Sequence, residues 1–155
     1  STSVRDEVDA VNTKGPAMRP LPFLLLLLTT PAAAAGLDVT VTGARGATGE
    51  VGCALYASEA GFPTDAAPAT QLWQPARTES VTCRFEGLRP GRYAVAVSHD
   101  LNGNRRTDTN FLGIPTEDWG VSNNIRPTLR APRFSEAAVE VPEGPATRIE
   151  IRLGR

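Results

Sequence analysis

An oxygen-rich stretch between residues 100 and 108 is the part of the sequence best suited to hold a cation. Its positions 1, 3, 5 and 9 are Asp100, Asn102, Asn104 and Asp108, and position 7 is Arg106, whose backbone carbonyl could be a further ligand. An EF-hand loop supplies oxygen ligands to Ca²⁺ at this spacing. The pattern therefore predicts a candidate Ca²⁺ site in this loop.

The match to an EF-hand loop is partial. Arg105 stands where the sharp turn needs glycine, and Phe111 stands where the bidentate glutamate belongs. A second carboxylate would have to be Asp108, or come from Glu117 or Asp118 after the chain folds back. With at most two carboxylates from the loop, we expect affinity in the millimolar range of weak extracellular sites. A structural loop is the alternative, because Asx side chains bond their own backbone and Asn102-Gly103 is a strong tight-turn signal.

The same carboxylates could instead catalyse hydrolysis. Asp100, Asp108 or Glu117 could act as general acid and base, provided that two of them face each other across a cleft. His99, the only histidine of the chain, is next to Asp100, but adjacent residues of a strand point to opposite faces. We therefore interpret His99 as a core residue and expect a non-catalytic protein, with a small secreted hydrolase as the alternative.

A partner could be bound by apolar residues in the long stretch between residues 98 and 137, which shows no periodicity. Loops of such length are usually functional or packed upon themselves. One interpretation is that Phe111, Ile114 and Trp119 plug one end of the fold. The other is that Phe111 and Trp119, together with Glu117, form a surface for a protein or carbohydrate partner.

Composition excludes several other classes of function. The chain of 155 residues carries 16 basic and 17 acidic side chains, and this net charge of -1 argues against binding to nucleic acid. One histidine and two cysteines exclude His-rich metal cages and four-cysteine zinc sites. The 14 glycines and 13 prolines favour short strands and turns over long helices.

The N-terminal part has the features of an export signal. Met18-Arg19 precedes an apolar run at 21–28 and small residues at 32–35, the three regions of a secretory signal peptide. The apolar run is too short to cross a membrane, which needs about 20 residues. We expect cleavage after Ala35 and a periplasmic or secreted protein with neither a lipid anchor nor a membrane span. Residues 1–17 are interpreted as upstream sequence from a misplaced start, 18–35 as the signal peptide and 36–155 as one domain.

A period of two predicts the elements that must position these residues. Apolar side chains alternate with polar or small ones in six segments, and Gln71–Gln74 adds a short seventh. Strands with one apolar face pack as two layers. The pattern predicts an all-β protein, an antiparallel β-sandwich of about seven strands with one long ordered loop. The six segments are 37–41, 51–55, 81–85, 93–97, 137–141 and 149–153.

The two cysteines share the inward phase of their predicted strands. An exported chain with two such residues favours a Cys53–Cys83 disulfide over two buried free thiols. The positions are 30 residues apart. The chain-entropy model gives about 3.5 kcal/mol for closing a loop of that length.

Several motifs resemble those of known sandwich proteins. The turn from Leu88 to Tyr93, with Pro90-Gly91 at its centre, looks like the one common in transthyretin-like and carboxypeptidase-regulatory-like sandwiches. We expect the sandwich to be transthyretin-like or immunoglobulin-like. A longer series resembles the DUF2141 domain, a bacterial family of secreted proteins, over about residues 37–153. The resemblance implies a secreted β-sandwich and leaves the activity open; the family usually has glycine in place of Arg105. The motifs that carry it are His99-Asp100-Leu101-Asn102-Gly103-Asn104, Asp108-Thr109-Asn110, Gly113-Ile114-Pro115-Thr116-Glu117 and Trp119-Gly120-Val121-Ser122-Asn123-Asn124.

Overall fold

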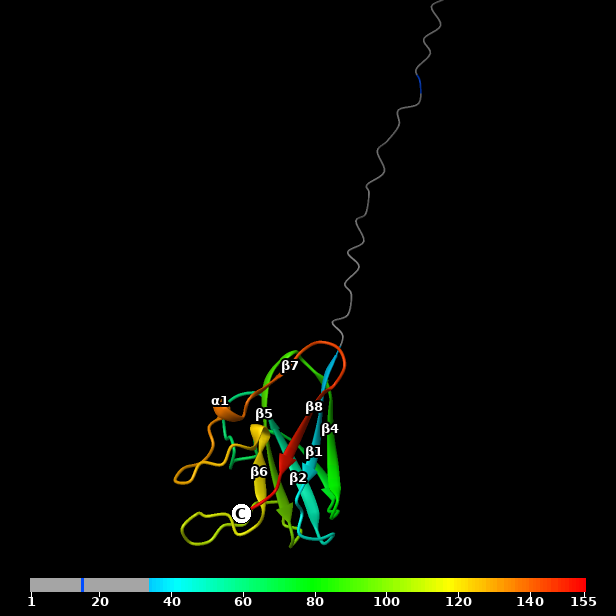
Figure 1. The fold of residues 1–155 in the computed structure, drawn as a ribbon. Coiled ribbons are helices and arrows are strands. Elements are labelled where there is room, and N and C mark those ends of the chain that lie inside the picture. The colour runs from blue at the N-terminus through cyan, green and yellow to red at the C-terminus, as the bar shows by residue number, and fades with distance from the viewer. Residues whose placement is uncertain (1–14, 16–33) are drawn as a thin grey trace, which may run out of the picture. The chain divides into compact units, whose positions relative to one another are not determined.

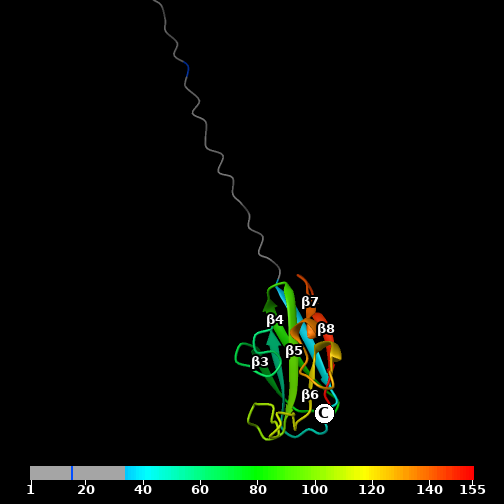
Figure 2. The same ribbon diagram turned by 90° about the vertical axis from the view of Figure 1, so that its left-hand side faces the viewer.

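Two β-sheets face each other in the part of the chain that the structure describes (Figures 1 and 2). The structure is a computed structural model, and it describes Gly15 and residues 34–155. The predicted upstream segment except Gly15, and residues 18–33 of the predicted signal peptide, lie outside the described residues. No helix among the described residues is long and apolar enough to cross a membrane.

The first sheet, sheet A, has the strand order β4 (Ser80–Leu88), β1 (Ala35–Thr42) and β8 (Thr147–Arg152). Sheet B has the order β3 (Thr70–Pro75), β2 (Glu50–Tyr56), β5 (Gly91–Asp100) and β6 (Trp119–Val121), and β7 (Val139–Val141) also pairs with β5. Two helical turns, η1 (Ser122–Asn124) and α1 (Phe134–Ala137), lie between β6 and β7.

The predicted sandwich is confirmed, with three differences in detail. The predicted strand at 137–141 is shorter, because Ala137 ends the helical turn α1 and β7 covers only Val139–Val141. β1 and β8 pair in parallel, so that Val39 lies opposite Ile149, whereas the other strand pairs of the described residues are antiparallel. β6 escapes prediction because three residues with Gly120 at the centre are too short to display a period of two. β1 begins at Ala35, one residue before the predicted mature N-terminus, and the cleavage position stays a prediction.

The core lies between the inward faces of the two sheets. In β1, Leu37, Val39 and Val41 are at most 2% exposed, as their alternation with polar residues predicts. A disulfide crosses the core from Cys53 of β2 in sheet B to Cys83 of β4 in sheet A, with Cα atoms 6.5 Å apart. The predicted bridge is therefore confirmed, and it links the two sheets.

A second apolar cluster covers the outer face of sheet B. Ala94 of β5 and Val121 of β6 are buried there, and Phe62 and Phe134 pack against them together with Trp119. Because Phe134 belongs to α1, this helical turn is held against the sheet. The cluster fixes β6, and β6 is where the long loop after β5 returns to the sheet.

Candidate functional site

The loop of residues 101–118 leaves sheet B at the end of β5 and returns to it at β6 (Figure 1). Ser98 and Trp119 lie opposite each other in the β5–β6 pair, so the two ends of the loop are fixed side by side. Three carboxylates at its base are buried, because Asp100 is 0% exposed, Glu117 5% and Asp118 4%. Buried charges need hydrogen-bond donors, which the loop supplies to Asp100 and Glu117 and Arg45 supplies to Asp118.

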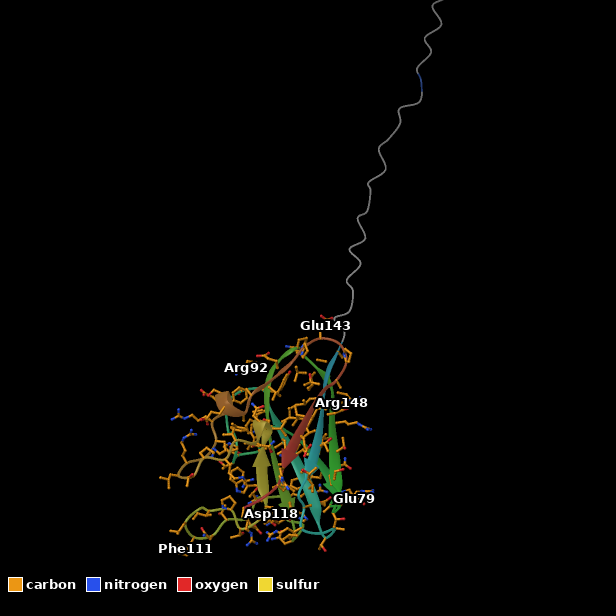
Figure 3. The ribbon with its side chains drawn as sticks, in the orientation of Figure 1. Glu79, Arg92, Phe111, Asp118, Glu143 and Arg148 are labelled. Atoms are coloured by element: carbon orange, nitrogen blue, oxygen red, sulfur yellow. A yellow bond between two sulfur atoms is a disulfide. The ribbon has the colours of Figure 1, made fainter. Side chains whose placement is uncertain are left out.

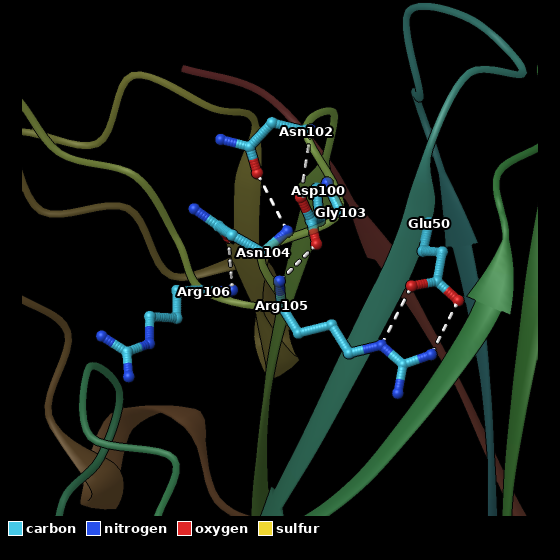
Figure 4. A network of polar contacts seen from close by, with 7 residues as sticks. All are labelled: Glu50, Asp100, Asn102, Gly103, Asn104, Arg105 and Arg106. Atoms are coloured by element: carbon cyan, nitrogen blue, oxygen red, sulfur yellow. Dashed lines mark hydrogen bonds and ion pairs between the residues drawn. The ribbon is translucent and has the colours of Figure 1, made fainter.

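Asp100 organises the first turn of the loop through backbone N–H groups (Figure 4). Its Oδ1 accepts hydrogen bonds from the N–H groups of Gly103 at 2.8 Å and Asn102 at 3.2 Å. Its Oδ2 accepts one from the N–H of Arg105 at 2.6 Å. Three donors stabilise the buried carboxylate and fix the path of residues 100–105.

Arg105 has a left-handed backbone conformation, with φ of 55°, that glycine adopts at little steric cost. This conformation explains the glycine that the resembled motif usually has here. The arginine side chain compensates, because its Nε and Nη2 donate to the two carboxylate oxygens of Glu50 at 3.0 and 3.1 Å. Its Cζ also lies 5.6 Å from the centre of the Trp73 ring. Arg105 thereby ties the loop to β2 and β3.

Asn102 and Asn104 extend the network, because each side-chain oxygen accepts a hydrogen bond from the backbone N–H two residues further along the chain, as Oδ1 of Asp100 does. Oδ1 of Asn102 accepts from the N–H of Asn104 at 3.0 Å, and Oδ1 of Asn104 accepts from the N–H of Arg106 at 2.9 Å. Their side-chain NH₂ groups donate to the two oxygens of Asp108, at 2.5 Å from Asn102 and 2.7 Å from Asn104. The side chains of Asn102, Asn104 and Asp108 therefore meet, whereas the carboxylate of Asp100 bonds backbone only.

This network is complete without a cation. Asn102 and Asn104 direct amide nitrogens, which are not metal ligands, at Asp108. To offer carbonyl oxygens instead, both amide groups would have to turn by about 180° and lose the backbone N–H groups that they now accept. No group of three or more His, Cys, Asp or Glu side chains suited to a metal ion occurs among the described residues. The arrangement is that of the structural alternative, and the Ca²⁺ site stays a prediction.

Glu117 joins the two arms of the loop at its base. Its Oε1 accepts from the N–H of Leu101 at 2.9 Å, and its Oε2 accepts from the N–H of Asp108 at 3.1 Å. The prediction that Glu117 belongs to a partner-binding surface is wrong, because a side chain 5% exposed has no surface to offer. The carboxylate is buried because each of its oxygens accepts a hydrogen bond from a backbone N–H inside the loop.

His99 and Asp118 lie at the same end of the core. His99 is 1% exposed, as expected for a core residue; its Nε2 lies 2.8 Å from the backbone oxygen of Thr48. Its backbone N–H donates to the backbone oxygen of Asp118 at 2.9 Å. The carboxylate of Asp118 accepts from Nε of Arg45 at 2.5 Å. These contacts attach the returning arm of the loop to β5 and to the segment before β2.

The outer end of the loop is a tight hairpin that carries the apolar tip, defined here as Phe111, Leu112 and Ile114. Oδ1 of Asn110 accepts from the N–H groups of Leu112 at 2.9 Å and Ile114 at 3.0 Å. The N–H of Asn110 donates to the backbone oxygen of Ile114 at 2.9 Å. Phe111 is 94% exposed, Leu112 68% and Ile114 55%, and Figure 3 shows Phe111 projecting from the loop.

Phe111, Ile114 and Trp119 thus have different surroundings. The plug interpretation is wrong for Phe111 and Ile114, because neither side chain packs into the end of the sandwich. Trp119 packs against the second apolar cluster, on the outer face of sheet B. The guanidinium carbon of Arg126 lies 4.6 Å from the centre of the Trp119 ring, so this ring is covered.

The family model described as "Uncharacterized protein conserved in bacteria (DUF2141)" matches residues 39–150. The chain belongs to the DUF2141 family. The matched residues run from β1 into β8 and include the whole loop. No curated protein and no solved structure matches the chain.

The Ser122-Asn123-Asn124 motif of this DUF2141 domain is a structural clamp. Oγ of Ser122 accepts from the N–H of Val95 at 3.0 Å and donates to the backbone oxygen of Ala137. Nδ2 of Asn123 donates to the backbone oxygens of Glu136 at 3.0 Å and of Ala138 at 3.2 Å. The motif is visible in the sequence, but its role depends on partners in segments that only the fold brings close.

Glu136, next to this clamp, forms an ion pair at the surface. Nη2 of Arg130 lies 2.6 Å from its Oε1, and the backbone N–H of Arg133 donates to its Oε2 at 2.9 Å. Hydrogen bonds from Arg130 and from the backbone of Arg133 lower the pKa of Glu136 from 4.5 to about 2. The pair connects the segment before α1 to the helical turn itself.

The carboxylates of the DUF2141 loop hold structure and do not form an acid–base pair. A glycosidase-like mechanism needs two carboxylates that face each other across a cleft. Both oxygens of Asp100 and both of Glu117 accept backbone N–H groups, and those of Asp108 accept asparagine amides. The geometry therefore gives the hydrolase alternative no support. The part of the loop that is most open to solvent is its apolar tip. Nothing in the sequence besides its hydrophobicity indicated that Leu112 belongs to this exposed group.

Proposed function

We propose that this DUF2141 domain is an exported, non-catalytic binding module that docks its apolar tip onto a partner protein. The observation that carries the proposal is the exposure of Phe111, Leu112 and Ile114 on one hairpin. Apolar side chains that gather at one exposed place mark interaction surfaces. Full burial of such a side chain contributes about 1.5–3 kcal/mol.

The ordered backbone of the tip supports a binding role. Asn110 closes the hairpin with its side chain, and Asp108 accepts the N–H of Thr116 with its backbone oxygen at 2.8 Å. Ordering a loop on binding reduces affinity, and a loop ordered beforehand avoids most of that cost. The polar motif of the family therefore has a use in binding, because it fixes the place where the apolar side chains stand.

A protein partner fits the tip better than a carbohydrate or a nucleic acid. Sugars need hydrogen-bonding side chains beside an aromatic face, whereas the tip joins the exposed ring of Phe111 to two aliphatic side chains, and the Trp119 ring is covered by Arg126. Nucleic acid needs an excess of positive charge, and the chain has a net charge of -1. One phenylalanine and two aliphatic side chains match an apolar pocket on another protein.

Export is part of the proposal. The predicted signal peptide at 18–35 supports it, and so does the disulfide between Cys53 and Cys83, since disulfides form and persist in oxidising compartments. We therefore assign the domain to the periplasm or the secreted fraction.

Site-specific photo-crosslinking in cells that export the full chain tests the proposal. A photoreactive phenylalanine analogue replaces Phe111, and the matched control carries the same analogue at Leu129. Leu129 is 96% exposed and belongs to a different connection, the one between η1 and α1. We expect a discrete protein adduct from position 111 that position 129 does not give.

The double variant Leu112→Ser/Ile114→Ser shows whether the adduct depends on the whole tip. We expect it to keep the melting temperature and to lose the adduct from position 111. The same adducts from positions 111 and 129, or adducts with lipid only, would contradict docking on a protein. An adduct of twice the mass of the domain would mean that the tip docks onto a second copy of the chain and not onto a different protein.

A further inference from the structure

A groove of about 550 Å³ lies between β6 and β8, and no residue of the hairpin that carries the apolar tip lines it. Its lining includes Gly120 of β6, Asn124 of η1, Arg126, and Glu150 and Arg152 of β8. Gly154, which also lines the groove, is joined to Trp119 of β6, because each donates its N–H to the backbone oxygen of the other, at 3.0 and 3.1 Å.

The backbone edge of β8 in this groove is already occupied by a side chain. Nδ2 of Asn124 donates to the backbone oxygen of Glu150 at 3.2 Å, and its Oδ1 accepts from the N–H of Arg152 at 2.8 Å. A peptide therefore finds no free pair of backbone groups there to extend the sheet. Side chains are what the groove offers to a ligand.

The groove has more positively than negatively charged side chains, and its arginines lack ion-pair partners in the part of the chain that the structure describes. Arg126 and Arg152 have no carboxylate within ion-pair distance among the described residues, whereas arginines 45, 84, 92, 105 and 130 each have one. Arg155 adds a third guanidinium group to the lining, whose one acidic side chain is Glu150. The carboxylate of Glu150 accepts a hydrogen bond from Oγ1 of Thr42 at 3.1 Å. The groove therefore has an excess of unpaired positive charge.

Arg126 is held in place before any ligand arrives. Its Nη2 donates to the backbone oxygen of Trp119 at 2.8 Å, and its guanidinium carbon lies 4.6 Å from the centre of the Trp119 ring. Its Nε and Nη1 have no acceptor among the described residues and are left as donors. A guanidinium fork fixed in this way is suited to the two oxygens of a carboxylate or a phosphate.

We propose that the groove between β6 and β8 binds an oxyanion, the carboxylate or phosphate group of a small ligand, between Arg126 and Arg152. The site is independent of the apolar tip, and neither proposal rests on the other. Arg126 supplies the positioned fork, and Arg152 adds a second positive charge that raises affinity for a divalent anion.

A titration of the folded, disulfide-bonded domain with citrate and with inorganic phosphate, at constant ionic strength, tests this site. Amide NMR signals of Gly120, Asn124 and Gly154 report on binding. We expect saturable shifts confined to the groove, and the anion that saturates them identifies the preferred group. Arg126→Gln and Arg152→Gln should each weaken binding about tenfold or more, the effect of losing a charged hydrogen bond.

Arg148→Gln is the matched control. Arg148 belongs to the same strand β8 and is exposed, but it does not line the groove. We expect binding to this variant to equal that of the wild type. Linear shifts without saturation, or an equal loss in Arg148→Gln, would overturn the proposal. Because Arg126 also supports Trp119, Arg152→Gln keeps the test decisive if Arg126→Gln fails to fold.

Discussion

Replacement of Asp100 by alanine should destabilise the domain more than any other single change in the loop. Asp100 is 0% exposed, and its carboxylate accepts three backbone N–H groups at 2.6, 2.8 and 3.2 Å. The variant removes the charge together with the acceptors for all three donors. The first turn of the loop would then lose its fixed path.

The size of the effect follows from these bonds. A hydrogen bond to a charged group contributes about 1.5–3 kcal/mol, so three give a ceiling of roughly 4.5–9 kcal/mol. Asn102, Gly103 and Arg105 are exposed, so water replaces part of the loss. We expect Asp100→Ala to lower the free energy of unfolding by about 2–4 kcal/mol. Asp108→Ala, which frees only exposed asparagine amides, should cost about 1 kcal/mol or less.

Urea unfolding at pH 7, with 10 mM Ca²⁺ and with chelator, measures both variants against the wild type. We expect the cost of Asp100→Ala to be the same in the two buffers, because the network is complete without a cation. A site with a dissociation constant near 1 mM would instead stabilise the wild type alone by about 1.4 kcal/mol at this concentration. Equal costs for Asp100→Ala and Asp108→Ala would refute the role assigned to the buried carboxylate.

Three further predictions concern other parts of the chain. Replacing Cys53 and Cys83 by alanine should lower the free energy of unfolding by about 3.5 kcal/mol in urea titrations; an unchanged midpoint would argue against a stabilising bridge. Because Glu136 has its pKa lowered from 4.5 to about 2, its ion pair stabilises the fold above pH 4.5, and that contribution is lost as the pH falls through about 2. The stability difference between wild type and Glu136→Gln should therefore shrink over this range in thermal melts, and a constant difference would contradict the assignment. Mass spectrometry of exported protein should find an N-terminus at Gly36, and an intact segment before Ala35 on the exported protein would exclude cleavage there.

Alternation in the sequence was enough to predict most strands and the disulfide. Side chains in a strand point alternately to the two faces, so one phase of a segment such as 37–41 must be buried together. Cys53 and Cys83 share that phase, and the fold places them opposite each other. The parallel pairing of β1 with β8 is not encoded in this period, because alternation says nothing about the direction of the neighbouring strand.

The site was predictable only in its local part. Asp100 and the two asparagines act on backbone groups within five residues, so their spacing carries the information. Glu117 acts on Leu101, 16 residues away, and its burial depends on how the loop closes. The exposure of Phe111 contradicts the general tendency of aromatic residues to be buried, and only the hairpin built on Asn110 reveals it.

Backbone order at the loop tip tests most directly whether the polar residues hold the apolar tip in one conformation. ¹⁵N relaxation of the free domain gives order parameters for residues 110–114. We expect values of about 0.85, those of rigid backbone, and a marked decrease in Asn110→Ala, which keeps every apolar side chain but removes the acceptor for the N–H groups of Leu112 and Ile114. Order parameters below about 0.6 in the wild type would contradict an ordered binding surface at Phe111.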